Sequence, residues 1–247
     1  SSMSISFYPK LPVSGSGSGL TFPYFSAYQN GATTLTANMT NVSTTPIQVT
    51  STADFASSGF LLIENEIIQY TTKTATTFDG VITRGVKGTT NVAHTAGVAV
   101  TEAAAVTSTT SAAMVIDTIV ASNGITCTVP DSKIYFTNTG YYNIQFSAQL
   151  LNYTTSEDNV TIWLRKNGTD VSYSAGIQQV NAKHGSAPGA KIIGWNYVDT
   201  YAANDYVELY WASDTGNTIL ATYPAGTTPV HPISPSLILT VTFVSAV

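Results

Sequence analysis

A strict alternation of apolar and polar residues between Tyr141 and Leu150 constrains the fold of this chain more than any other feature. The segment reads YYNIQFSAQL, so every second residue from Tyr142 onward is apolar, and Asn, Gln or Ser fills the positions between. A period of two places the two sets on opposite faces of a β-strand, whereas a helix would scatter both sets around its axis. The segment is therefore predicted to be a strand with one face in a core and one polar face.

The same alternation returns in three later segments, 160–165, 206–211 and 237–244. Burying one large apolar side chain stabilises a fold by roughly 1.5–3 kcal/mol, so four such strands can supply the core of a domain. Turn-forming residues separate the segments, and Asn167-Gly168 is a strong signal for a β-hairpin. No segment shows the period of an amphipathic helix. These patterns predict an all-β fold built from antiparallel strands.

The composition limits what surface such a fold can have. Only 9% of the residues are charged, against about 25% in ordinary soluble proteins, although hydrophobic residues reach 43%. A chain this apolar is not intrinsically disordered. Little surface charge means little repulsion between molecules, which a protein tolerates when it is packed against neighbours. The composition thus favours β-sheets that are built into an assembly.

Charge and hydropathy exclude two classes of partner. The net charge is −5 and there is no basic stripe for a phosphate backbone, so we expect no nucleic-acid partner. There is no polybasic patch and no apolar run of the roughly eighteen residues that a membrane span needs, so we expect no membrane partner.

An internal disulfide is excluded, because Cys127 is the single cysteine. Cys127 is predicted to be a small core residue.

The chain divides into four parts. Residues 1–30 are predicted to form an N-terminal arm, residues 31–101 a small β module, residues 102–113 a linker of small uncharged residues, and residues 114–247 a second domain. The arm contains a Gly/Ser repeat, which is flexible unless a partner orders it or the arm packs on its own domain. Six apolar residues of the arm are candidate anchors for attachment to another protein: Phe7, Tyr8, Leu11, Phe22, Tyr24 and Phe25.

The small β module carries a recognisable pattern. Residues 82–98 read ITRGVKGTTNVAHTAGV, which contains Arg-Gly-x-x-Gly-Thr, then a histidine and a glycine. This pattern resembles a recurrent small module of tailed-bacteriophage structural proteins, and the resemblance implies a virion protein. Within the pattern we expect Arg84 and His94 to connect loops through hydrogen bonds rather than to act in catalysis or ligand binding.

The second domain carries three motifs in a familiar order. Residues 139–146 read TGYYNIQF, residues 162–168 end in Lys-Asn-Gly, and residues 204–209 read NDYVEL. Together with the strand at 237–244, these motifs resemble those of C1q/TNF-like jelly rolls, with Asn204 in place of the family's glycine. The resemblance implies a two-sheet jelly-roll sandwich that assembles into a homotrimer.

Aromatic residues on the polar side of the strands indicate where copies of the chain could meet. Tyr141, Trp163, Tyr206 and Tyr210 alternate with the apolar core set and so are expected on outer faces. Aromatic residues on the surface of a single chain are typical of faces that become buried when subunits associate. These four residues are therefore the candidate trimer interface. A loop or the arm could cover them instead, or the strand register could differ by one residue.

The search for chemistry finds no catalytic arrangement. Gly80 and Gly85 have the spacing of a phosphate-binding loop, but Val86 stands where such a loop requires lysine. His94, His184 and the third histidine, at position 231, are isolated and lack the spacing of metal ligands. We therefore expect no enzyme activity, no metal and no cofactor.

These expectations combine into one leading hypothesis. The chain is expected to be a trimeric decoration or cement protein on the outer capsid surface of a tailed bacteriophage, made in the host cytoplasm. Its partners would be further copies of itself and the major capsid protein or another virion protein. Under this hypothesis, deleting residues 1–30 should abolish attachment and leave the trimer intact.

Two other readings remain open. The chain could be a tail-fibre or baseplate adhesin that binds host glycans through loops 152–158, 181–190 and 212–217. A secreted C1q-like ligand is the third reading, and the phage-like pattern within residues 59–98 argues against it.

Overall fold

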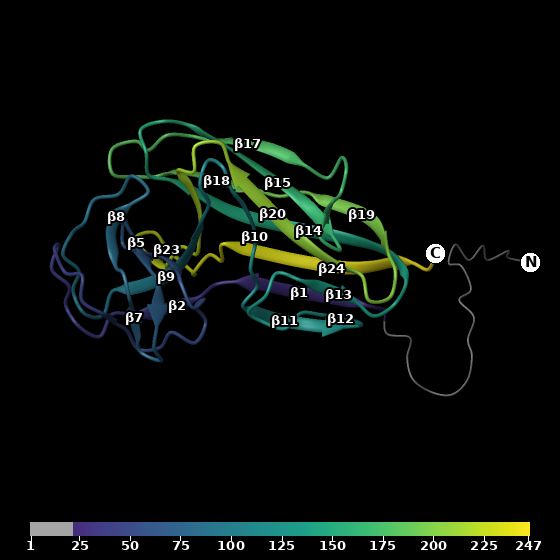
Figure 1. Cartoon of the computed structure of the whole chain (residues 1–247), viewed down its shortest axis with the longest axis horizontal. Helices are drawn as coiled ribbons and strands as arrows, with labels where there is room; N and C mark the ends of the chain where they lie inside the picture. Colours follow the sequence, from purple (N-terminus) through teal and green to yellow (C-terminus); the bar gives the residue numbers. More distant parts are fainter. Residues whose placement is uncertain (1–21) are drawn as a thin grey trace, which may run out of the picture.

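The computed structural model describes residues 22–247, and these residues form β-strands with no helix among them. The predicted all-β fold class is thereby confirmed. Figure 1 shows two parts: a sandwich of long strands that extends toward the C-terminus, and a module of shorter strands at its other end.

The first sheet of the sandwich contains two of the predicted strands side by side. Residues 141–150 lie in β14 and residues 237–244 in β24, and the two strands pair antiparallel with Ile144 opposite Val241. Two further strands continue the sheet beyond β24, in the order β11-β1-β24-β14, while β18, β19 and β21 pair with β14. The bounds are β1 Tyr24–Gln29, β11 Thr118–Asn123, β14 Gly140–Asn152, β18 Gly189–Ile193, β19 Asn196–Tyr201, β21 Thr218–Ala221 and β24 Leu237–Ser245.

The second sheet contains the other two predicted strands. β15 and β20 pair antiparallel with Trp163 opposite Tyr210. The predicted hairpin at Asn167-Gly168 is confirmed: both residues have positive φ (50° and 79°), and the turn joins β15 to β16. The bounds are β10 Ser111–Ala113, β12 Ile125–Thr126, β13 Ile134–Phe136, β15 Asp158–Lys166, β16 Thr169–Asp170, β17 Gly176–Val180 and β20 Tyr206–Ser213.

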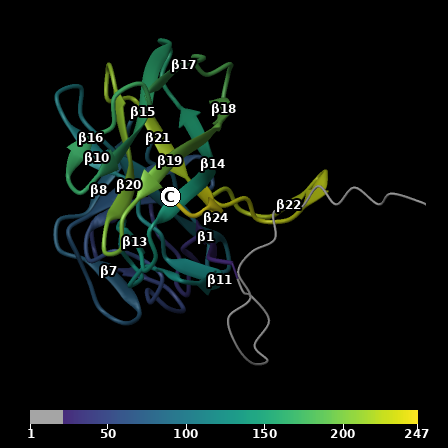
Figure 2. The same ribbon diagram turned by 90° about the vertical axis from the view of Figure 1, so that its right-hand side faces the viewer.

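The main core lies between the two sheets, as a jelly-roll sandwich requires. The inward residues of both sheets are the apolar members of the alternating segments, and Tyr142 and Trp211 are fully buried among them. Cys127 belongs to the same core, which confirms the prediction for the single cysteine. Figure 2 looks along the sandwich and shows the sheets as two layers, with the hairpin of β22 (Gly226–Thr227) and β23 (Val230–His231) extending beyond the layer of β14 and β24.

The N-terminal module has a hydrophobic core of its own, which includes Leu61, Ile68 and Phe78. Its β4–β5 hairpin closes through Glu64, which adopts a positive φ of 54°. The module strands are β2 Ala32–Thr34, β3 Ile47–Gln48, β4 Gly59–Ile63, β5 Glu66–Tyr70, β6 Thr72–Lys73, β7 Thr77–Asp79, β8 Thr83–Val86 and β9 Ala99–Ala105.

The module and the sandwich are joined through a continuous sheet. The end of β9 pairs with β21, with Ala104 opposite Leu220. A third hydrophobic cluster spans this junction and brings Leu62 and Ile67 of the module against Leu151 of the sandwich. Residues 102–113, which the sequence predicts to be a linker, contain the end of β9 and the whole of β10, so this stretch is built into both sheets.

The predicted arm also ends inside the fold. Residues 24–29 form β1, which pairs with β11 on one side and β24 on the other. Phe25 is buried in the main core, whereas Phe22 and Tyr24 are exposed. The remaining candidate anchors, Phe7, Tyr8 and Leu11, lie outside the described residues. Deleting residues 1–30 would therefore remove a central strand, so a deletion that tests attachment has to end before β1.

Candidate functional site

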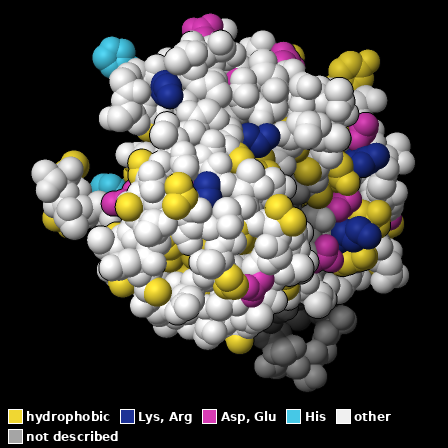
Figure 3. Space-filling model, turned by 60° about the vertical axis from the view of Figure 1, so that its left-hand side comes forward, with side chains coloured by type: hydrophobic (Ala, Val, Ile, Leu, Met, Phe, Trp, Pro, Cys, Tyr) yellow, Lys and Arg dark blue, Asp and Glu magenta, His cyan; other side chains and the backbone are white. Residues whose placement is uncertain are grey.

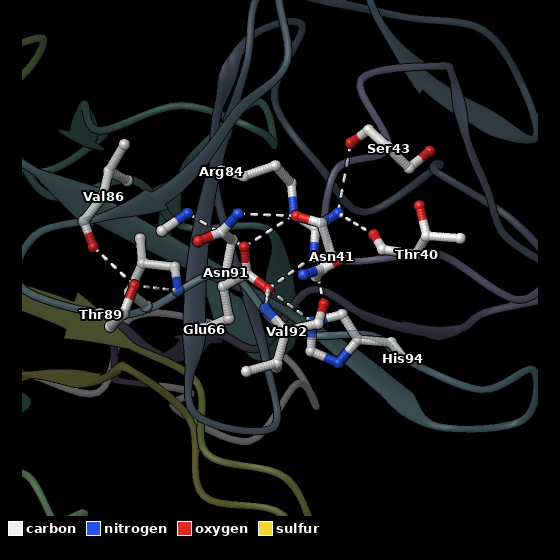
Figure 4. A network of polar contacts seen from close by, with 12 residues as sticks. Thr40, Asn41, Ser43, Glu66, Arg84, Val86, Thr89, Asn91, Val92 and His94 are labelled. Carbon is white, nitrogen blue, oxygen red and sulfur yellow. Dashed lines mark hydrogen bonds and ion pairs between the residues drawn. The ribbon is translucent and has the colours of Figure 1, made fainter.

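A buried ionic network occupies the module at the positions of the phage-like pattern. Arg84 and Glu66 form a two-point ion pair in which Nε lies 2.7 Å from Oε1 and Nη2 lies 2.7 Å from Oε2 (Figure 4). The Glu66 side chain is fully buried and that of Arg84 nearly so. Arg84 also donates to the carbonyl oxygens of Thr40, Ser43 and Val92. The prediction that Arg84 connects loops is confirmed.

His94 completes this network from the opposite side. Its Nδ1 lies 2.7 Å from Glu64 Oε2 and its Nε2 lies 2.7 Å from Glu66 Oε2. A carboxylate only accepts, so His94 donates from both nitrogens as an imidazolium. Burial alone would lower the pKa of His94, but the hydrogen bonds to Glu66 and Glu64 outweigh it and raise that pKa. Burial likewise opposes ionisation of Glu66, yet bonds from His94 and Arg84 lower its pKa to about 2.

The backbone geometry explains why glycine occupies two positions of the pattern. Gly85 and Gly88 have φ values of 61° and 80°, which other residues rarely adopt. A Cβ on Gly85 would lie 2.8 Å from the backbone nitrogen of Asn91, and one on Gly88 would lie 3.0 Å from the carbonyl oxygen of Tyr153. Gly88 therefore lets the module turn approach the sandwich closely. The charged groups of the network bond to one another and to backbone carbonyl oxygens, and these contacts hold the module together.

A further buried carboxylate lies where the module meets the sandwich. Glu102 on β9 accepts hydrogen bonds from Gln29 Nε2 (3.0 Å), Thr222 Oγ1 (2.8 Å) and Ser236 Oγ (2.7 Å). Burial raises the pKa of Glu102 to about 7, the bonds from Ser236 and Thr222 oppose that rise, and the nearby Asp117 adds to it. Three segments of the sandwich thus converge on one residue of the module.

The outer face of the first sheet contains no charged residue along its three central strands. We call the outward side chains of β1, β24 and β14 the uncharged face. None of these strands contains Asp, Glu, Lys, Arg or His. Tyr24, Ile238 and Tyr141, one from each strand, are 44%, 44% and 41% exposed. The other members are Ser, Thr, Asn and Gln, apart from Tyr28, Val244 and Leu151, and Leu151 is buried where the module packs on the sandwich.

The outer face of the second sheet is different, and we call the outward side chains of β13, β20 and β15 the charged face. Its aromatic rings are in contact with charged groups of the same chain. Trp163 Nε1 donates to Asp170 Oδ1 at 2.8 Å, and the Arg165 guanidinium lies 4.5 Å from the centre of the Tyr210 ring. Lys133 lies 5.0 Å from the centre of the Tyr206 ring. These rings are therefore partly covered within one chain.

The four predicted interface residues lie on opposite sides of the sandwich. Trp163 and Tyr210 are cross-strand neighbours with ring centres 5.9 Å apart, and Tyr206 lies on the same face of β20. Tyr141 lies on the uncharged face, across the core from the other three. Sequence reasoning did not single out Ile238, although the absence of charge from three strands was visible and could have indicated its face.

The loops that the adhesin reading favours gather at the end of the sandwich that meets the module. The backbone nitrogen of Lys183 donates to the carbonyl oxygen of Thr154 at 2.8 Å, and Lys87 Nζ of the module donates to that of Gly216 at 2.8 Å. Tyr153 is the single aromatic residue in loops 152–158, 181–190 and 212–217, and it is buried. These loops therefore present no exposed aromatic ring for a sugar.

Metal and membrane features were sought in the same stretch of chain. Residues 22–247 contain no group of three or more His, Cys, Asp or Glu side chains arranged to hold a metal ion. Nor does that stretch contain a helix long and apolar enough to cross a membrane. Charged side chains are few on the face that Figure 3 shows, and acidic and basic groups lie next to one another at its right-hand edge.

No protein-family model matches the chain, and no curated protein matches it. Its function has to be argued from the geometry described above.

Proposed function

We propose that this chain is a structural protein of a tailed-bacteriophage virion, and that it decorates the outer capsid surface as a homotrimer. The uncharged face is the observation that carries the proposal. Burying Tyr24, Ile238 and Tyr141 against another copy stabilises the complex by roughly 25 cal/mol per Å² of apolar surface. No charge has to be removed from water along the three central strands, which is the usual cost of burying a protein surface.

The construction of the module supports a mechanical role. The turn at Gly88, within the phage-like pattern, packs on the sandwich, and β9 pairs with a strand of the sandwich sheet. The charged groups of the network have hydrogen-bond partners within the module. Such a unit transmits force without a hinge between its parts. Its partner would be the major capsid protein or another virion protein, and bound subunits would stabilise the shell by mass action without turnover.

Counting the copies of this chain in purified virions by quantitative mass spectrometry tests the proposal. Hundreds of copies per particle are expected for capsid decoration. A handful would favour a tail-fibre or baseplate adhesin, and absence from the particle would overturn the virion assignment.

A matched deletion tests the attachment arm. Removing residues 1–21 leaves β1 in place, so the variant should keep the oligomeric state of the full chain and lose binding to particles that lack the protein. Normal particle binding by this variant would contradict a role for the arm.

A further inference from the structure

The hairpin of β22 and β23 projects from the sandwich on the side of the uncharged face (Figure 2). Its two strands pair with each other and with no other strand of the described chain. The hairpin leaves the body at Tyr223 and Ser234, whose backbone groups bond to each other. A two-stranded hairpin with no further strand or helix behind it is marginally stable in water. Such a hairpin gains stability when another surface packs against it.

Contacts within the hairpin fix its shape in advance. The His231 ring stacks on Tyr223, with ring centres 6.5 Å apart and an interplanar angle of 24°. Gly226 makes room for that ring, because a Cβ there would clash with His231 Nε2. Residues 224–235 include four prolines, which restrict the backbone further. An element that is preorganised in this way loses little conformational freedom when it binds.

The tip of the hairpin is apolar and uncharged. Residues 224–235 contain no Asp, Glu, Lys or Arg, and Val230 on β23 is 87% exposed. Pro224, Pro229 and Pro232 lack the backbone N–H that an added strand would need, so the hairpin offers side chains rather than a sheet edge for contact. Burying the tip therefore removes apolar surface, and no charge of the hairpin, from water.

A hollow of about 510 Å³ lies at the base of the hairpin, on the outer side of the first sheet. Strand pairing places Ala190 opposite Leu151 and Ile192 opposite Gln149, so one shared face of β18 and β14 forms its floor. Because Gln149 is an outward residue of β14, the hollow is continuous with the uncharged face. The lining is completed by Ala187, Pro188, Lys191 and Tyr223, of which Lys191 alone is charged.

A closed trimer requires two different surfaces on each copy. In a ring of three subunits the contacts run head to tail, so one patch of each copy meets a different patch of the next. The hairpin is a projection and the hollow is a recess, and both adjoin the uncharged face. We infer that the β22–β23 hairpin of each copy packs into the hollow beside β14 of the next copy. The inference rests on the proposed function, since it names the surfaces that join the copies of the homotrimer.

Cross-linking between two variant chains tests the inference. Val230→Cys on the hairpin and Ala190→Cys in the hollow are co-expressed and treated with a short bismaleimide, which joins accessible thiols. The native Cys127 is buried in the core. The mixture should yield linked chains on a denaturing gel, and neither variant alone should. The matched control pairs Val230→Cys with Ile177→Cys, at a position that is 72% exposed beside the charged face, and it should yield none.

A charge at the tip gives a second measurement. Val230→Lys should weaken self-association about tenfold in sedimentation velocity, because its ammonium would have to leave water in the hollow of the next copy. Val42→Lys is the matched control, at an exposed position of the module, and its association should equal that of the unaltered chain.

Three results would overturn the inference: the chain associates while Val230→Cys and Ala190→Cys do not cross-link, Val230→Cys cross-links to itself, or Val230→Lys associates like the unaltered chain. Each of these leaves the proposed homotrimer standing, because the copies would then meet through other surfaces. A chain that stays monomeric at every concentration would overturn the homotrimer and the inference together.

Discussion

The two outer faces of the sandwich are built from the same kind of alternating strand, yet they differ in how their aromatic side chains are used. On the charged face, Trp163 bonds to Asp170 and Tyr210 lies under Arg165, so the rings already have partners. On the uncharged face, Tyr24, Tyr141 and Ile238 project from strands that contain no charge at all. The outward aromatic residues therefore fall into two groups, and we propose that those of the uncharged face, rather than those of the charged face, meet another copy of the chain.

The comparison also separates two ways of carrying little charge. The module buries the side chains of Arg84, Glu66 and His94 in a network, so these charges are shielded from solvent. The uncharged face has no charged residue to bury. The first arrangement holds the module together, and we propose that the second favours association, so variants can test the two contributions separately.

The largest expected effect comes from breaking the buried network. Arg84→Met should lower the free energy of unfolding by about 3–5 kcal/mol, because Glu66 loses its two-point partner inside the protein. The matched change on the charged face, Arg165→Met, removes a solvent-exposed ion pair and should lower the free energy of unfolding far less. Urea unfolding at pH 6 measures both. Equal losses would contradict the distinction between buried and surface charge.

The second effect concerns pH and the junction. The folded pKa of Glu102 is about 7, against 4.5 for the free group, so the free energy of unfolding should fall as pH rises from about 4.5 to about 7. The upper limit of this fall is about 3 kcal/mol. The raised pKa of His94 likewise makes the free energy of unfolding fall as pH rises above 6.5. The lowered pKa of Glu66 acts in acid, where its contribution to stability is lost as pH falls from 4.5 toward 2.

Glu102→Gln should flatten the profile between pH 4.5 and 7, and Glu157→Gln at an exposed position should leave it unchanged. Thermal unfolding across this range is the measurement. Association through the uncharged face should not follow the same profile, because its strands contain no Asp, Glu, His, Lys or Arg. Parallel pH profiles for unfolding and association would contradict this separation.

The third effect places a charge on the uncharged face. Ile238→Lys should weaken self-association about 100-fold, or about 2.7 kcal/mol, because the ammonium would have to leave water at the contact. Ile177→Lys is the matched control, since Ile177 is 72% exposed on β17, beside the charged face, and its replacement should leave association unchanged. Sedimentation velocity compares the two. Loss of association in Ile177→Lys alone would move the interface to the other side of the sandwich.

The smallest effect tests the interface residues that the sequence first suggested. Trp163→Phe removes the bond to Asp170 and should cost about 0.5–1.5 kcal/mol of stability with no change in association. Chemical unfolding and sedimentation on one sample give both values. A dissociated but fully stable variant would restore Trp163 to the interface.

Much of the sandwich could be predicted from the sequence because period-two alternation is a local signal. It located β14, β15, β20 and β24, and Asn167-Gly168 located the hairpin between β15 and β16. The module pattern likewise predicted the loop contacts of Arg84 and His94. These features depend on neighbouring residues, which a sequence displays directly.

The parts that sequence reasoning missed depend on long-range pairing. β1 follows a Gly/Ser repeat, and it becomes a strand because β11 and β24 pair with it from distant positions. The alanines at 103–105 resemble a linker, yet they pair with β21 at the junction. Alternation predicts that Tyr141 and Trp163 both point outward, but it does not tell that they lie on opposite sheets.

The most direct test of the account is sedimentation velocity on the full chain at micromolar concentration, together with the Ile238→Lys variant. The account predicts that the unaltered chain sediments as a trimer and that the variant sediments as a folded monomer. A chain that stays monomeric at every concentration, or a variant that still forms the trimer, would contradict the claim that the uncharged face joins copies of this protein.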